Sequence, residues 1–309
     1  MMKDKNVIVT GGLGFIGSHL TDRLLKDGNK VTVIDNCSTG SINNLAMKDH
    51  ENLKIIKGSI TELDLEKIFQ GKDYIFHQAA LASVEESIKD PIKCHRINAT
   101  GTLRILQAAS KCNIIKVLNA STSAVYGNNP KIPLDENETP RPLSPYAASK
   151  VSAEFYCHVY KECYGLDTVS LRYFNVFGPR QNPKSEYAAV IPRFIHAILS
   201  GENPIIYGDG NQTRDFIYVE DVVEANLLLA ESDFTGQINV ATGKSVTINQ
   251  LLELIGEICG IEIKAEYQDP RPGDIKDSRA DISLLKSLGF KKLTSLKNGL
   301  EKTIKWHKR

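Results

Sequence analysis

A tyrosine and a lysine one helical turn apart are the side chains of this sequence best suited to moving a proton. Tyr146 precedes Lys150 by four residues, so on a helix both side chains lie on one face. Of the eleven tyrosines, Tyr146 alone has a lysine at this spacing. A free tyrosine ionises near pH ~10, and a neighbouring cation favours its phenolate. The pair predicts a general base with a lowered pKa, although two unrelated surface residues would show the same spacing.

A cluster of hydroxyl side chains lies upstream of this pair. Ser121, Thr122 and Ser123 follow directly after an apolar segment that reads as a strand. In open α/β sheets, ligands bind beyond the carboxyl ends of the strands. The cluster is therefore a candidate for contact with a substrate, and ordinary turn chemistry explains it equally well.

A glycine-rich loop opens the chain. Gly11, Gly14 and Gly17 come between an apolar strand and an amphipathic stretch, and Asp35 closes the next strand. In this context the glycines allow a tight turn, close approach to a pyrophosphate and close helix–strand packing, and the helix N-terminus donates N–H groups to phosphates. An acid at position 35 accepts hydrogen bonds from ribose hydroxyls and repels a 2′-phosphate. The loop therefore predicts NAD as the cofactor, in preference to NADP.

The elements that must position these residues alternate through the first half of the chain. Apolar runs predict strands at 6–10, 30–35, 53–57, 73–77, 115–120 and 168–173. Helical spacing predicts helices at 15–26, 63–69, 92–111 and 146–164. This alternation predicts an α/β fold of the Rossmann type, a doubly wound parallel sheet with helices on both faces.

The pattern changes after about residue 175, where Gly and Pro become frequent and the elements shorten. We expect residues 1–175 to form the NAD-binding domain, with 215–242 returning to it. Residues 176–214 and 243–309 would form a smaller C-terminal α/β domain for the substrate. The cleft between the two parts is the expected active site.

Composition excludes several classes of function. The chain has 309 residues and a formal net charge of +1, without a basic patch for nucleic acid. Its apolar runs are too short to span a bilayer, and no targeting segment is recognised. The six cysteines show neither paired nor metal-ligand spacing. We therefore expect a cytoplasmic protein without a metal site, a membrane segment or a nucleic-acid partner.

With these motifs placed, the sequence resembles the extended short-chain dehydrogenase/reductase family, and in particular its nucleotide-sugar epimerases. The greatest likeness is to UDP-N-acetylglucosamine and UDP-glucose 4-epimerases. The motifs occur in family order at 11–17, 35–40, 77–84, Asn98, 121–127, 146–150, 172–181, 182–194, 214–216 and 271–274.

The resemblance implies roles for individual residues. Tyr146 would be the general base, Lys150 its electrostatic partner and a ribose ligand, and Thr122 the hydroxyl that bonds the reacting oxygen. NAD would contact Gly11, Gly14, Phe15, Ile16, Gly17, Asp35, Asn36, Ser38, Thr39, Gly40, Ser59, Ile60, Gln78, Ala79, Ala80, Ala82, Asn98, Tyr146, Lys150 and Phe174. The substrate would contact Ser83, Thr122, Tyr146, Asn175, Val190, Tyr207, Arg214, Arg271, Asp274 and Ser278.

Three of these roles are more specific. Asn175, Arg214 and Arg271 would hold the diphosphate of a sugar nucleotide, since guanidinium groups match phosphate oxygens. Asn98 would hold the region of Lys150 through water or cofactor contacts. Ser59 stands where many relatives carry an Asp that contacts adenine.

The neighbours of Thr122 distinguish reactions within the family. Nucleotide-sugar 4,6-dehydratases place Asp-Glu directly after the Thr, and UDP-glucuronate decarboxylases place a Glu two residues after the hydroxyl. This chain has Ser123 and Ala124 there, so elimination lacks its acid and base. The resemblance therefore implies an isomerase, a 4-epimerase that oxidises and re-reduces C4 of a UDP-hexose through a 4-keto intermediate with bound NAD.

The choice of sugar rests on Ser278, which holds the position that gates the C2 substituent in the 4-epimerases. A small residue there implies that UDP-GlcNAc and UDP-GalNAc are accepted alongside UDP-Glc and UDP-Gal, because it leaves room for the N-acetyl group. A UDP-glucuronate 4-epimerase and a non-catalytic NAD sensor on the same fold are the alternatives.

The family also commonly dimerises through two helices per subunit. Here the candidates are 92–111 and 146–164, and we expect a homodimer. Leu103, Leu106, Phe155 and Val159 could serve that interface or be buried against the sheet.

Overall fold

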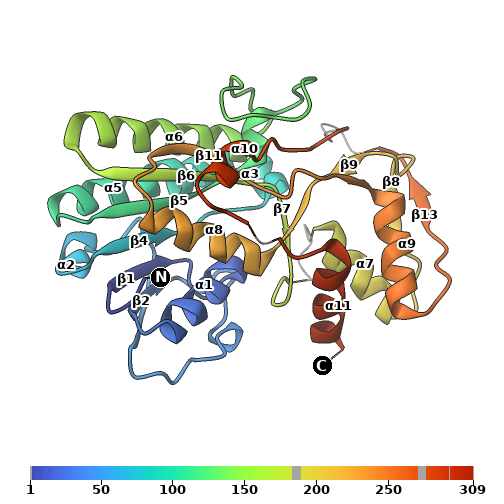
Figure 1. Cartoon of the computed structure of the whole chain (residues 1–309), viewed down its shortest axis with the longest axis horizontal. Coiled ribbons are helices and arrows are strands. Elements are labelled where there is room, and N and C mark those ends of the chain that lie inside the picture. The colour runs from blue at the N-terminus through green and yellow to red at the C-terminus, as the bar shows by residue number, and fades with distance from the viewer. Residues whose placement is uncertain (1, 183–188, 271–275, 292, 309) are drawn as a thin grey trace.

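A seven-stranded parallel sheet is the largest sheet in the described residues (Figure 1). The computed structural model describes residues 2–182, 189–270, 276–291 and 293–308. The strand order is β11-β6-β5-β4-β1-β2-β3. The strands are β1 (Asn6–Thr10), β2 (Lys30–Asp35), β3 (Leu53–Lys57), β4 (Tyr74–His77), β5 (Lys116–Thr122), β6 (Asp167–Tyr173) and β11 (Gly236–Val240). All of their pairings are parallel, and the predicted fold class is confirmed.

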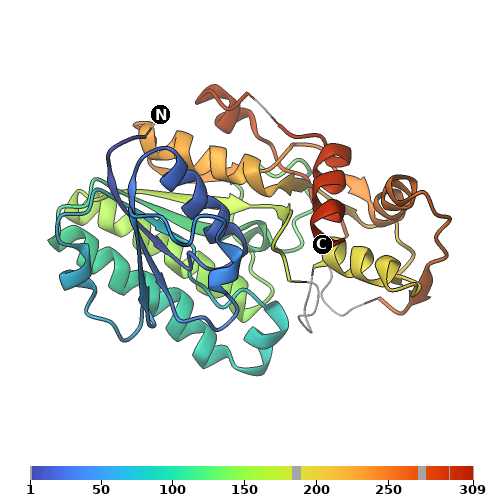
Figure 2. The same cartoon turned by 90° about the horizontal axis from the view of Figure 1, so that it is seen from below.

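Helices cover both faces of this sheet (Figure 2). On one face lie α1 (Phe15–Lys26) and α8 (Val219–Glu231), and on the other α2 (Leu65–Phe69), α5 (Gly101–Lys111) and α6 (Pro145–Tyr164). Val7 and Val9 of β1 join the first core, whereas Ile8 between them joins the second. Two buried faces explain why the strands are apolar throughout instead of alternating.

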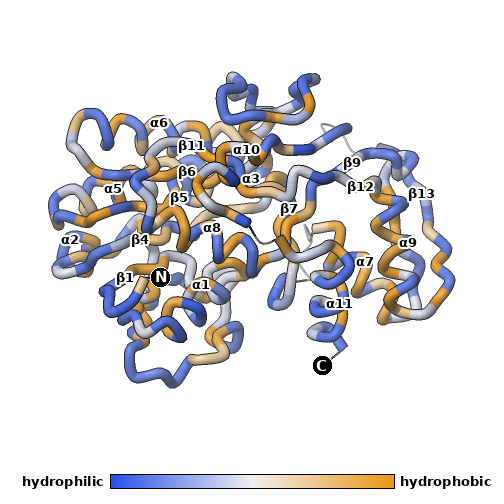
Figure 3. The backbone as a smooth tube through the Cα atoms, in the orientation of Figure 1, coloured by the Kyte–Doolittle hydropathy of each residue, from blue (hydrophilic) through white to orange (hydrophobic). Residues whose placement is uncertain are grey.

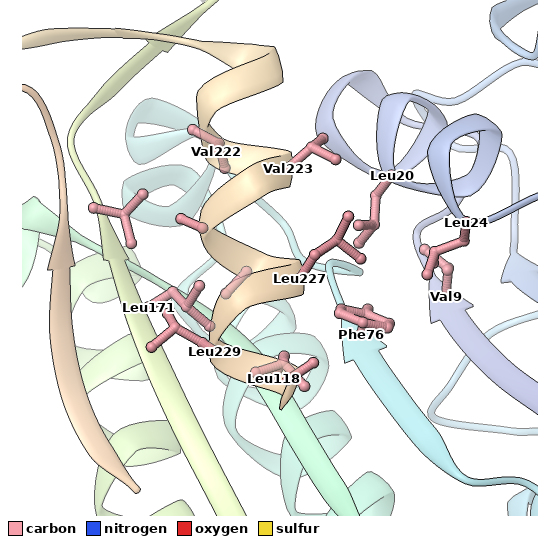
Figure 4. Packing of buried hydrophobic residues seen from close by; sticks show 14 of the residues in the cluster. Val9, Leu20, Leu24, Phe76, Leu118, Leu171, Val222, Val223, Leu227 and Leu229 are labelled. Carbon is pink, nitrogen blue, oxygen red and sulfur yellow. The ribbon is translucent and has the colours of Figure 1, made fainter. Parts of the chain in front are cut away.

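The core under α1 and α8 is continuous across the sheet. Figure 4 shows Leu227 of α8 beside Leu20 of α1 and Phe76 of β4, and all three are buried. Burying such side chains contributes about 1.5–3 kcal/mol each. Figure 3 shows that apolar residues lie along the strands, whereas polar residues lie in the outer loops.

A second group of helices and short strands lies beside the sheet, to the right in Figure 1. It contains three two-stranded sheets, which pair β7 (Asn175–Phe177) with β10 (Phe216–Tyr218), β8 (Ile205–Tyr207) with β13 (Glu266–Gln268), and β9 (Thr213–Arg214) with β12 (Val246–Thr247). Its helices are α7 (Val190–Leu199), α9 (Ile248–Cys259) and α11 (Leu296–His307). Phe194, Leu251 and Leu300 of these helices are buried in one core. In the part of the chain described, no helix is long and apolar enough to cross a membrane.

The helix predicted at 92–111 contains a π-helical turn. Residues 92–111 divide into α4 (Pro91–His95), a π-helical turn (Arg96–Thr100) and α5. The turn places Asn98 so that its amide bonds both backbone groups of Leu81, a contact between distant residues that helical spacing does not reveal. Two further short helices are α3 (Val84–Lys89) and α10 (Ser283–Ser287).

Candidate active site

The structure brings together the three side chains predicted to act on the substrate. Tyr146 and Lys150 lie in the first turns of α6, which begins where the Ser144 hydroxyl accepts a hydrogen bond from the Ala147 N–H. The Tyr146 phenol hydrogen-bonds the side chain of Thr122, which ends β5. Lys150 is buried and its Nζ donates to the carbonyl oxygen of Ala120, 2.8 Å away. A strand end and a helix start thus meet at the carboxyl edge of the sheet.

The pKa values of this pair differ from the sequence prediction. Burial raises the pKa of Tyr146 to about 12, while the hydrogen bond with Thr122 acts in the opposite direction. Burial also lowers the pKa of Lys150 to about 8, against smaller opposing effects of nearby thiols and Glu154. The expected lowering of the phenol's pKa is therefore not found in the chain itself, because desolvation outweighs the effect of the neighbours.

The glycine loop has the geometry of a phosphate-binding turn. Gly11 has a φ of +66°, and an added Cβ there would lie 2.7 Å from the backbone nitrogen of Ala79. A Cβ on Gly17 would lie 2.1 Å from the Gly11 carbonyl oxygen. Gly14 is the N-cap of α1, and neither a side-chain cap nor an acid in the first turn competes for its N–H groups. The helix start therefore fits a dinucleotide pyrophosphate.

Asp35 ends β2 beside this loop and is buried. Its Oδ2 accepts a hydrogen bond from the Leu13 N–H at 3.0 Å, and its Oδ1 accepts one from the Cys37 N–H at 2.8 Å. A carboxylate has about four acceptor positions, so capacity remains for ribose hydroxyls. The segment that follows Asp35 packs on the loop, since the Ser41 N–H donates to the Leu13 carbonyl oxygen.

The other predicted cofactor residues also follow strand ends at this edge. Phe15 and Ile16 begin α1, Asn36, Ser38, Thr39 and Gly40 follow β2, Ser59 and Ile60 follow β3, Gln78, Ala79, Ala80 and Ala82 follow β4, and Phe174 follows β6. The Ser59 hydroxyl bonds that of Thr61 at 2.7 Å, so its hydrogen bonding is already local.

Comparison with known proteins decides the family. Residues 7–241 match the model of the NAD dependent epimerase/dehydratase family. The chain belongs to this family. A putative UDP-glucose 4-epimerase of Methanocaldococcus jannaschii is 41% identical over 305 residues, 98% of each chain.

Two solved structures are similar to almost the whole chain. One is the UDP-N-acetylglucosamine 4-epimerase from Methanobrevibacter ruminantium M1 in complex with UDP-N-acetylmuramic acid, with a TM-score of 0.97 and 56% identity over 99% of each chain. The other is the UDP-glucuronic acid 4-epimerase from Bacillus cereus in complex with UDP-glucuronic acid and NAD, with a TM-score of 0.91 and 32% identity over 98% of this chain and 99% of that one. The chain is an isomerase, an NAD-dependent UDP-sugar 4-epimerase.

The predicted substrate residues of this epimerase lie at the edge of the sheet and on the elements beside it. Asn175 begins β7, Arg214 ends β9, Tyr207 ends β8 and Val190 begins α7, while Ser83 is the N-cap of α3. Ser278 is buried in the segment beside β9, where the Thr213 N–H donates to the Lys276 carbonyl oxygen. Arg271 and Asp274 lie outside the described residues.

The Asn98 side chain contacts the helix that carries Tyr146 and Lys150. Its side-chain nitrogen donates to the Ser149 hydroxyl, 3.0 Å away, and Ser149 precedes Lys150 on α6. Asn98 is 1% exposed. It therefore links Leu81 directly to the helix that carries Tyr146 and Lys150.

A buried ion pair behind Thr122 was missed by sequence reasoning. Glu154 accepts hydrogen bonds from the Ser121 hydroxyl at 2.5 Å and from Arg172 Nη2 at 2.8 Å. Both side chains of the ion pair are at most 4% exposed. One signal was available, because Glu154 lies four residues after Lys150 and so shares its face of the helix. Its partner on β6 could not be found from spacing.

The buried ammonium of Lys150 predicts a pH dependence of stability. Its folded-state pKa of about 8 lies below the ordinary 10.5, so between these values the unfolded chain binds a proton that the folded chain lacks. The free energy of unfolding therefore rises with pH across this window. Below the window, the folded protein bears the full cost of burying the charged ammonium. Lys150→Met should raise the free energy of unfolding at pH 7 by about 1–3 kcal/mol while abolishing turnover.

Urea denaturation of the two proteins freed of NAD, at pH 7 and pH 10, measures this effect. The difference between wild type and Lys150→Met should shrink at the higher pH. Lys26→Met, at an exposed position of α1, is the control and should show a pH-independent difference. If the difference in unfolding free energy between wild type and Lys150→Met were also the same at pH 7 and pH 10, the buried ammonium would not destabilise the folded protein.

Proposed function

We propose that this epimerase interconverts UDP-GlcNAc with UDP-GalNAc, and also UDP-Glc with UDP-Gal. The observation that carries the choice of sugar is Ser278, a small, buried side chain in the segment next to Arg214 and β9. A serine leaves room for an N-acetyl group at C2, which a bulky side chain would fill. The similarity to the Methanobrevibacter UDP-N-acetylglucosamine 4-epimerase supports the same choice.

Tyr146, Thr122 and Lys150 would carry the proton transfer. The bound cofactor supplies a hydride acceptor and a positive charge near the phenol. Because the pKa of Tyr146 is raised to about 12, chiefly by burial, neighbouring positive charge is needed to hold its phenolate at neutral pH. The Tyr146 oxygen then takes the proton of the sugar O4, and the Thr122 hydroxyl bonds the same oxygen. Asn175 and Arg214 would hold the diphosphate while the 4-keto sugar turns.

The proposal is tested by incubating the NAD-bound enzyme separately with UDP-GlcNAc, UDP-Glc, UDP-glucuronate and UDP-N-acetylmuramic acid and resolving the epimers. We expect turnover of the first two. Turnover of UDP-glucuronate alone would establish the alternative that the Bacillus cereus enzyme represents. Inactivity on all four, with NAD bound, would favour a sensor in place of an enzyme.

A substitution at Ser278 tests the pocket itself. Ser278→Tyr should lower kcat/KM for UDP-GlcNAc at least about tenfold more than for UDP-Glc, because the phenol occupies the space of the acetyl group. Kinetics with both substrates measure the ratio, and Ser278→Ala is the matched control that should leave it unchanged. Equal losses for the two substrates would contradict the assignment of Ser278 to the C2 pocket.

We also propose that the enzyme is a homodimer formed through α6. Phe155 is 60% exposed and Val159 42% exposed on this helix, whereas Leu106 of α5 is buried in the sheet core and Leu103 is partly buried against it. The two exposed side chains therefore remain for an interface. Light scattering after size-exclusion chromatography tests the dimer.

The six free thiols suit a reducing compartment, which we propose is the cytoplasm.

A further inference from the structure

Asp215 is a fully buried acid between β9 and β10 to which the mechanism assigns no part. Its Oδ1 accepts hydrogen bonds from the N–H of Thr242 at 2.9 Å and from the Thr242 hydroxyl at 2.6 Å. Its Oδ2 accepts hydrogen bonds from the N–H groups of Gly243 at 2.9 Å and Ala280 at 3.3 Å. One carboxylate thus joins the turn after β11, in the sheet domain, to the segment 276–281.

Of the segments that meet at Asp215, the turn 242–243 carries no predicted substrate residue, and the other three each carry one. Arg214 precedes it directly in the chain, and Ser278 lies two residues before Ala280. The carbonyl oxygen of Asp215 accepts hydrogen bonds from the backbone N–H of Asn175 at 3.1 Å and from its side-chain nitrogen at 3.2 Å. Two of the proposed diphosphate ligands, Asn175 and Arg214, and the segment of the proposed sugar gate are therefore all tied to Asp215.

The chemistry of this position requires a carboxylate. All four groups that face the two oxygens are donors, and three of them are backbone N–H groups that cannot turn to accept. An asparagine in either orientation would direct its NH₂ group at one or more of these N–H groups. A leucine or alanine would leave them buried without acceptors.

We propose that Asp215 is a positioning residue that holds Asn175, Arg214 and the Ser278 segment in the arrangement that binds the UDP-sugar. This inference rests on the proposed function. Asp215 itself touches neither substrate nor cofactor, because its carboxylate is fully buried and its partners belong to the protein. Loss of the carboxylate should therefore weaken substrate binding more than the chemical step, since Tyr146, Lys150 and Thr122 lie on other elements.

The test is Asp215→Asn in the NAD-bound enzyme. We expect KM for UDP-GlcNAc and the Kd of UDP, measured by calorimetry, to rise at least about fivefold while kcat stays within about twofold and NAD occupancy is unchanged. The ratio of UDP-GlcNAc to UDP-Glc turnover should also shift, because the segment of Ser278 is released. If this variant does not fold, Thr242→Val removes one donor only and should raise KM in the same direction.

Asp221 supplies a matched control for a purely structural loss. It is also buried, and its carboxylate accepts hydrogen bonds from the N–H and hydroxyl of Thr294, at 2.8 and 2.9 Å. Asp221→Ala should lower stability and leave KM and Kd unchanged. The same KM and Kd in Asp215→Asn as in wild type, or an equal rise in both variants, would overturn the inference. A wild type that neither binds UDP nor turns over a UDP-sugar would overturn the proposed function instead.

Discussion

Tyr146→Phe should lower epimerase turnover by about 10²–10⁴-fold, the range that a positioned general base contributes. The substitution removes only the phenol oxygen. Because burial raises the pKa of Tyr146 to about 12, the neutral phenol is the stable form in the chain, and its loss costs about one hydrogen bond, to Thr122. The variant should therefore remain folded and bind NAD. Epimer analysis, NAD occupancy and thermal melting measure the three properties.

A second tyrosine of the same helix is the matched control. Tyr160 is a buried residue of α6 and stacks on Tyr164 at 4.6 Å between ring centroids, away from Thr122 and Lys150. Tyr160→Phe should retain wild-type turnover. If Tyr146→Phe also retained substantial activity with NAD bound, another group would have to act as the base.

The sheet could be predicted from the sequence because its signals are local. Three strands, at 6–10, 30–35 and 53–57, match the observed bounds, as does the helix at 15–26. Each apolar run is bounded by turn residues, and the glycine loop sets the register between the first strand and helix. Position along the chain then places Tyr146 and Thr122 at the same edge.

What escaped prediction depends on partners far apart in the sequence. Asp215 and Ala280 meet across 65 positions, and Asn98 meets Leu81 through a π-helical turn that residue spacing does not encode. Leu106 and Phe155 look alike as apolar residues on helices, yet one is 0% and the other 60% exposed. Burial is a property of the neighbouring elements, so a single helix pattern cannot supply it.

Breaking the buried ion pair behind the site should have the largest effect on stability. Glu154→Gln keeps the shape of the side chain and leaves the charge of Arg172 without its counter-charge. Removing one partner of a buried pair costs about 3–5 kcal/mol, since the remaining charge is desolvated and unpaired. Arg172 would still donate hydrogen bonds to the Tyr126 hydroxyl and the Glu136 backbone carbonyl oxygen. Both of these acceptors are neutral, so neither replaces the lost counter-charge. Urea denaturation followed by circular dichroism measures the loss.

An exposed pair shows what a charge alone contributes. Lys111 Nζ lies 2.5 Å from Glu66 Oε1, and the side chains of Glu66 and Lys111 are 48% and 55% exposed. Glu66→Gln should therefore lower the free energy of unfolding by less than about 1 kcal/mol. Adding Arg172→Met to Glu154→Gln removes the unpaired charge and should recover part of the stability. An equal cost at positions 66 and 154 would contradict this account. A double variant no more stable than Glu154→Gln would show instead that the hydrogen bonds of Arg172, and not its charge, hold β6 to the strand of Thr122.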